Sequence, residues 1–93
     1  MSQGQWTFFS NHGHVLVSLA RDPDSRIRDV AQVVGITERA VQQIVRDLVQ
    51  EGYLDKTKVG RRNHYRVVGE AHFRHELEAG ATLGEFLALV VDR

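Results

Sequence analysis

The sequence contains no cysteine and a single proline. None of its apolar runs approaches the roughly 20 residues that a helix needs to span a bilayer. Without cysteine the chain has no disulfide framework, no thiolate nucleophile, no iron–sulfur cluster and no thiolate-ligated zinc. The first residues also lack the basic-then-apolar layout of a secretion signal. We therefore expect a cytoplasmic protein with no membrane partner.

Net charge is absent as well, because 12 basic and 12 acidic residues cancel over the 93 residues, a length that fits one small domain. The charges are nevertheless unevenly distributed. Residues 26–66 carry nine basic and five acidic groups, and the stretch 56–66 is basic with no acidic residue. Both flanking segments are net acidic. A basic central segment of this kind indicates a surface for a nucleic acid, which the zero net charge conceals.

Apolar residues recur at helical spacing on both sides of the single proline. The first stretch predicts a helix over about 10–21, which Ser10 or Asn11 would cap at its start. The polar cluster around Pro23 must end that helix. A second apolar stripe follows and stops at Gly35, a residue type that ends helices in the left-handed conformation. The sequence therefore predicts two consecutive helices separated by the proline.

A third helix is predicted over about 38–51, with Thr37 as its N-cap. Its apolar residues repeat every 3.6 positions and are expected to face the core. They are Val41, Ile44, Val45 and Leu48. Beyond Gly52 the apolar period changes from 3.6 to 2, which indicates the end of the helical region.

The period of two predicts strands over 53–59 and 64–68, joined by a basic tip at 60–63. The chain then returns to a helical pattern. Thr82 and Glu85 have the spacing of a capping box, and the residues after them are strongly apolar. The fold class is therefore mainly α with a small antiparallel β hairpin (α+β).

The stretch Ile27–Ile44 resembles a helix-turn-helix. Ala31 must be small because the second helix of this motif, predicted over about 38–51, crosses over it. Gly35 allows the sharp turn between the two helices. With the basic hairpin after it, the chain looks like a winged helix-turn-helix with an appended C-terminal helix, similar to compact bacterial regulators of the MarR and ArsR type. The resemblance covers about 10–68. The predicted organisation is an aromatic arm over 1–9, the winged helix-turn-helix over 10–68 and a dimerisation segment over 69–93.

The resemblance implies sequence-specific binding of double-stranded DNA by a transcriptional regulator. The outward side chains of the third helix suit base edges, arginine for guanine and glutamine for adenine. The start of that helix suits a phosphate oxygen, and the basic wing over 56–66 suits the backbone or the minor groove. The predicted DNA-binding residues are Thr37, Glu38, Arg39, Gln42, Gln43, Arg46, Lys56, Lys58, Arg61, Arg62 and His64.

Apolar residues at both ends of the chain exceed what one small core needs. We therefore expect a homodimer with two-fold symmetry, closed by the terminal segments. The predicted interface residues are Trp6, Phe8, Phe9, Phe86, Leu87, Leu89 and Val90. Because the chain is shorter than a typical MarR-type regulator, the sequence leaves open whether it senses a small-molecule effector.

Two other interpretations compete with DNA binding. The polar face of the third helix is also consistent with simple solvation, and a winged helix also serves as a protein-interaction module within larger assemblies. The histidine pairs 12/14 and 72/75, the latter beside Glu76, are better explained as surface residues than as a metal site. The sequence has no catalytic or phosphate-binding motif, so neither an enzyme nor a cofactor is expected.

Overall fold

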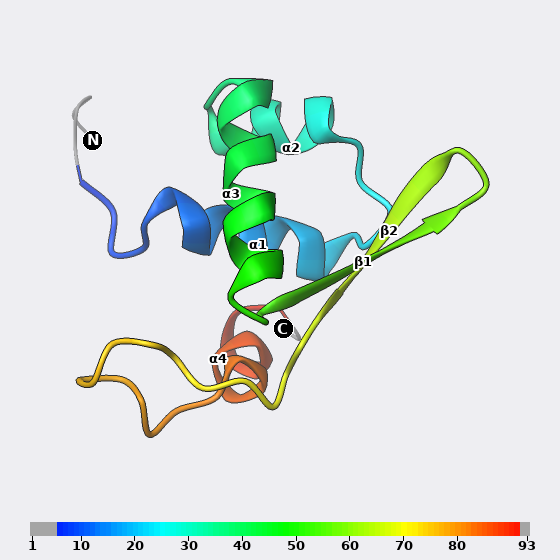
Figure 1. Ribbon diagram of the computed structural model, residues 1–93. Helices are drawn as coiled ribbons and strands as arrows, with labels where there is room; N and C mark the ends of the chain where they lie inside the picture. Colours follow the sequence, from blue (N-terminus) through cyan, green and yellow to red (C-terminus); the bar gives the residue numbers. More distant parts are fainter. Residues whose placement is uncertain (1–5, 92–93) are drawn as a thin grey trace.

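The computed structural model describes residues 6–91, so the ends of the predicted arm (1–5) and of the predicted dimerisation segment (92–93) lie outside it. The elements are α1 (Asn11–Arg21), α2 (Ile27–Val34), α3 (Glu38–Gln50), β1 (Leu54–Val59), β2 (Arg62–Val67) and α4 (Leu83–Val90). In Figure 1, α3 crosses α1, with α2 above them and α4 below. The predicted fold class is confirmed. Within the described residues, none of the helices is long and apolar enough to cross a membrane.

The first three helices enclose the main core. Ser10 begins α1 by accepting a hydrogen bond from the Gly13 amide, as the sequence predicted. The apolar stripe of α3 is buried throughout and packs with residues of α1 and α2. The buried residues of these helices are Val15, Leu16, Leu19, Val30, Ala31, Val41, Ile44, Val45 and Leu48. The helical periods read from the sequence thus identify the core faces.

The turn between α2 and α3 depends on Gly35, which has φ +86°. The amides of Gly35 and Ile36 both donate to the carbonyl of Ala31, which ends α2. Thr37 then caps α3 by accepting from the amide of Ala40 at 3.0 Å. This arrangement confirms the predicted helix-turn-helix.

The hairpin formed by β1, its turn and β2, hereafter the wing, extends away from the helices (Figure 1). Its turn is shorter than the sequence predicted, because β2 begins at Arg62 and only Gly60 and Arg61 lie between the strands. Gly60 has φ +64°, as in two-residue hairpin turns with glycine at the first central position. The amide of Tyr65 donates to the carbonyl of Pro23, which ties the wing to the loop after α1.

The C-terminal segment folds back onto the same core. Thr82 and Glu85 form the predicted capping box, and Leu83 is only 2% exposed. The amide of Leu83 donates to the carbonyl of Ala71, and that of Gly84 donates to the carbonyl of Gly69. A Cβ on Gly84 would lie 3.1 Å from that Gly69 oxygen, so the close approach requires glycine. The helix α4 is therefore an integral part of the folded body.

Replacement of Gly35 by alanine is expected to lower the free energy of unfolding by about 1–2 kcal/mol, because a left-handed conformation is strained for a residue with a Cβ. No atom lies within 4 Å of the added Cβ, so no steric clash contributes to the loss. Gly35→Asn should lose less, because asparagine tolerates this conformation. Gly80→Ala is the control, because its added Cβ also meets open space and its φ is not positive. Urea unfolding of the three variants measures the differences; equal stabilities of G35A and G80A would contradict the account.

Candidate nucleic-acid interface

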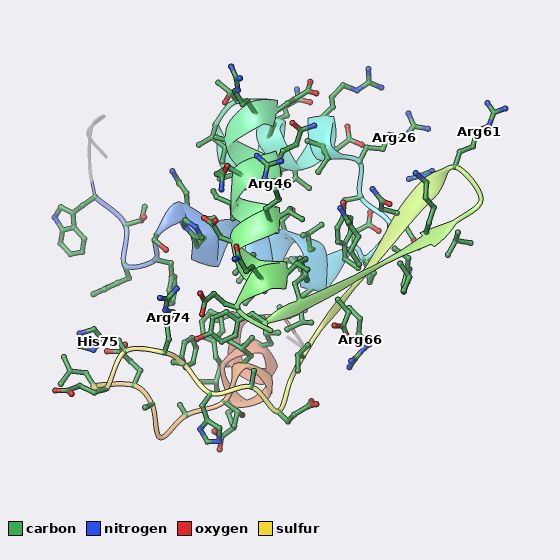
Figure 2. The ribbon with its side chains drawn as sticks, in the orientation of Figure 1. Arg26, Arg46, Arg61, Arg66, Arg74 and His75 are labelled. Carbon is green, nitrogen blue, oxygen red and sulfur yellow. The ribbon has the colours of Figure 1, made fainter. Side chains whose placement is uncertain are left out.

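The helix α3 presents a polar face opposite its buried stripe. Its exposed side chains include the predicted base-reading residues Glu38, Arg39, Gln42, Gln43 and Arg46. Figure 2 shows Arg46 on the side of α3 that faces away from α1. Glu38 lies in the first turn, where a carboxylate is favoured by the helix dipole. The hydroxyl oxygen of Thr37 accepts the capping hydrogen bond from the Ala40 amide, so Thr37 fixes the start of α3.

A hydrogen-bonded chain runs across this face and connects it to α1. Arg46 Nη2 donates to Gln43 Oε1 at 2.9 Å, and Gln43 Nε2 donates to Asp47 Oδ1 at 3.0 Å. The other carboxylate oxygen of Asp47 lies 2.8 Å from His12 Nε2. The hydrogen bonds from His12 and then Gln43 lower the pKa of Asp47. Asp47, which the sequence analysis did not select, thus links the polar face to the first helix.

The basic residues predicted to form one surface on the wing lie on different faces of the hairpin. Arg61 occupies the turn and is exposed, and Lys56 and Lys58 are exposed on β1. Lys56 lies opposite Tyr65 and Lys58 opposite Asn63, so the two lysines share one face of the hairpin. Arg62 and His64 belong to the other face, because side chains alternate along β2.

Both of these β2 side chains bond to the loop after α1. Arg62 Nη2 donates to the backbone carbonyl of Asp24, and His64 Nδ1 lies 2.8 Å from the Asp24 carboxylate. The sequence pattern predicted Arg62 at the tip of the hairpin, as part of a basic wing suited to the DNA backbone. Because the turn is only two residues long, Arg62 instead begins the strand and anchors it.

Arg26 is a basic residue of this surface that the sequence analysis did not select. It is the N-cap residue of α2, where no side chain caps the helix. Arg26, Arg61 and Arg62 line one open hollow of about 410 Å³ between the start of α2 and the wing, and Figure 2 shows Arg26 and Arg61 at the same end of the molecule. The sequence did contain a signal for Arg26, because this residue follows the polar cluster at Pro23 and stands at the start of a helix.

The predicted dimer residues fall into two groups. Phe9 and Phe86 pack against each other with ring centroids 5.2 Å apart, and Phe86 also contacts Phe73. Trp6, Phe8 and Leu89 are 77%, 88% and 68% exposed, whereas Leu87 and Val90 are half-buried. Part of the apolar excess at the termini is therefore used inside the monomer.

The histidines hold local contacts. His14 lies 3.2 Å from the Thr7 hydroxyl, and His72 lies 2.8 Å from the Ala79 carbonyl oxygen. His75 accepts from the amide of Leu77. Among residues 6–91, no group of three or more side chains is placed to hold a metal ion.

Comparison with known proteins identifies the fold. Residues 10–55 match the family model described as winged helix-turn-helix DNA-binding. The chain therefore has the winged helix-turn-helix fold. The match covers α1, the helix-turn-helix and the start of the wing, which is the part of the chain that carries the polar face of α3.

Solved structures agree with this assignment. The PcaV transcriptional regulator from Streptomyces coelicolor, solved with its natural ligand, is 25% identical, with a TM-score of 0.59 over 90% of this chain and 61% of its own. The zinc-dependent MarR family transcriptional regulator AdcR is 18% identical, with a TM-score of 0.51 over 73% of this chain and 49% of its own, and shows the fold alone. This chain thus spans about half of AdcR and about three fifths of PcaV. No curated protein sequence matches it significantly.

Removal of the His12 imidazole in a His12→Ala variant is expected to raise the pKa of Asp47 toward its ordinary value, because the largest contribution that lowers it is lost. A folded-state pKa below the unfolded value stabilises the fold above the unfolded pKa, and this contribution is lost as the pH falls through the folded pKa. When the pH falls, the free energy of unfolding of the variant should therefore decrease less than that of the unaltered protein. A carboxyl-carbon NMR titration of Asp47 measures the pKa, with His14→Ala as the control that leaves it unchanged. An unshifted Asp47 in H12A would show that the contact is not populated.

Proposed function

We propose that this protein is a dimeric bacterial transcriptional regulator that binds double-stranded DNA by sequence. The helix α3, predicted over 38–51, lies in the major groove, and the basic wing over 56–66 lies on the backbone or in the minor groove. The observation that carries the proposal is the polar face of α3 together with an arginine pair, Arg26 and Arg61, beside the wing turn. Such a protein would act in the cytoplasm, where its DNA is.

The geometry suits a duplex. The major groove of B-DNA, about 12 Å wide, admits one α-helix, and the reading residues of a helix-turn-helix lie toward the start of its second helix. Arg39, Gln42 and Gln43 are exposed in the first two turns of α3. The helix α2 precedes α3 and has Arg26 as its N-cap residue, so this arginine would lie over the backbone that flanks the groove. The wing reaches further along the same duplex with Arg61.

Dimerisation follows from the apolar residues that the monomer leaves exposed. Trp6 and Phe8 stack edge to face at 5.3 Å, and Leu89 is exposed on α4. A two-fold dimer would cover these side chains and present two copies of α3 to two half-sites. PcaV and AdcR are transcriptional regulators of the same fold, which supports the regulatory role.

Arg61→Ala is expected to flatten the dependence of log affinity on log salt. Each phosphate contact contributes roughly 0.9 to this slope, so a two-fold dimer that loses two contacts should change it by about 1.8. The loss should be the same on every duplex, because a phosphate contact carries no sequence information. Equilibrium binding of the full chain to duplexes over a range of salt concentrations measures the slope.

Arg74→Ala is the matched control, because Arg74 lies at the opposite end of the molecule from Arg61 (Figure 2). The salt dependence of DNA affinity in this variant should equal that of the unaltered protein. An equal flattening by both variants would show that the wing is not a specific phosphate contact. An unaltered protein without affinity for any duplex would overturn DNA binding and favour a protein-interaction module.

The paired variant Phe8→Ser with Leu89→Ser is expected to convert the dimer to a monomer in sedimentation equilibrium, because it removes exposed apolar contact area without touching the core. Truncation before α4 would be a poor test, because it removes the buried Leu83. Val59→Ser is the control, since Val59 is an exposed apolar residue on the wing. An unaltered chain that is monomeric at tens of micromolar would contradict the dimer.

A further inference from the structure

The hydrogen-bonded chain on α3 uses both ends of one glutamine side chain. Gln43 donates through Nε2 to Asp47 and accepts through Oε1 from Arg46. The amide orientation is thereby defined, because a flipped amide would place a donor against Arg46 and an acceptor against the carboxylate. A glutamine that reads adenine must offer both its oxygen and its nitrogen to the base. Gln43 would have to give up two hydrogen bonds to do so.

Gln42 provides a direct contrast. It is the preceding residue, has the same chemical type and is exposed on the same helix. Within residues 6–91, no side-chain hydrogen bond of Gln42 is formed, and both ends of its amide are available to a base. The two glutamines therefore have different capacities, although the sequence alone makes them equivalent.

Arg46 keeps most of its donors. A guanidinium has five N–H groups, and among residues 6–91 only one nitrogen of Arg46, Nη2, donates a hydrogen bond. The remaining edge of the planar group is able to make the bidentate contact with guanine O6 and N7. Holding a long side chain in one orientation before binding reduces the entropy lost on binding.

Asp47 and His12 support this arrangement from behind. Asp47 is half-buried, and its two oxygens accept from Gln43 and meet His12 of α1, so the carboxylate is turned toward its own chain. A carboxylate that pointed at DNA would repel the phosphates. The contact between Asp47 and His12 also joins the face of α3 to the first helix.

We propose that Arg46 is a base-reading residue of α3, and that Gln43 and Asp47 are positioning residues that act through it, with His12 fixing Asp47. This inference rests on the proposed DNA binding and makes it more specific. Of the two adjacent glutamines, only Gln42 reads a base directly.

The test is selection of bound duplexes from a randomised library by the full-length protein, followed by sequencing to obtain the base preference at every position. Arg46→Ala should lose its preference at one base pair per half-site by about tenfold or more, the value of one bidentate contact. Gln43→Ala and Asp47→Asn should relax the preference at that same base pair. The double variant of Arg46 and Gln43 should lose no more than Arg46→Ala alone, because Gln43 acts only through Arg46.

Gln42→Ala is the matched control, and it should change the preference at a different base pair, additively with Arg46→Ala. Circular dichroism on each variant checks that these exposed substitutions leave the fold intact. The inference is overturned if Gln43→Ala changes a base pair of its own, additively with Arg46→Ala, or leaves the profile unchanged. If the unaltered protein enriches no sequence, sequence-specific binding itself is overturned. This result differs from a changed base preference in the variants, which tests only the roles of Arg46 and Gln43.

Discussion

Burial of one face of α3 is the interaction on which the rest of the structure depends. Val41 and Ile44 are buried in the core, and at helical spacing this places Gln42, Gln43 and Arg46 on the outside. The turn at Gly35 and the cap at Thr37 then determine where the exposed face begins. A rotation of α3 by one residue would expose apolar side chains and bury charged ones, so the core and the candidate interface are specified by one pattern.

The features that follow from short-range periodicity were predictable from the sequence. The helices, the glycine turn and the capping box at Thr82 depend on residues within four positions of each other, and each was found where the pattern indicated. The hairpin was predicted with the wrong turn, because the polar residues Arg62 and Asn63 suggested a loop. They pair with Val59 and Lys58 instead.

Contacts between distant parts of the chain were beyond such patterns. The bonds from Arg62 and His64 to Asp24 join residues about forty positions apart, so nothing local in the sequence distinguishes these two residues from Arg61. The bonds from Gln43 to Arg46 and Asp47 have helical spacing and were within reach of the sequence. The same limit applies to the aromatic residues, because Phe9 and Phe86 come from opposite ends of the chain. Their rings pack against each other, and Phe9 stays 46% exposed.

The ties between the wing and the loop after α1 have a mechanical consequence. A hairpin that is attached only at its base can swing, whereas this one is also held at Arg62, His64 and Tyr65 by residues of the loop at Pro23 and Asp24. These contacts restrain the wing, so the helical core determines where the turn that carries Arg61 lies relative to α3. A partner that contacts both the exposed face of α3 and the turn of the wing must match the distance between them. A partner whose shape differs must itself deform to bind, and the free energy of that deformation weakens its binding.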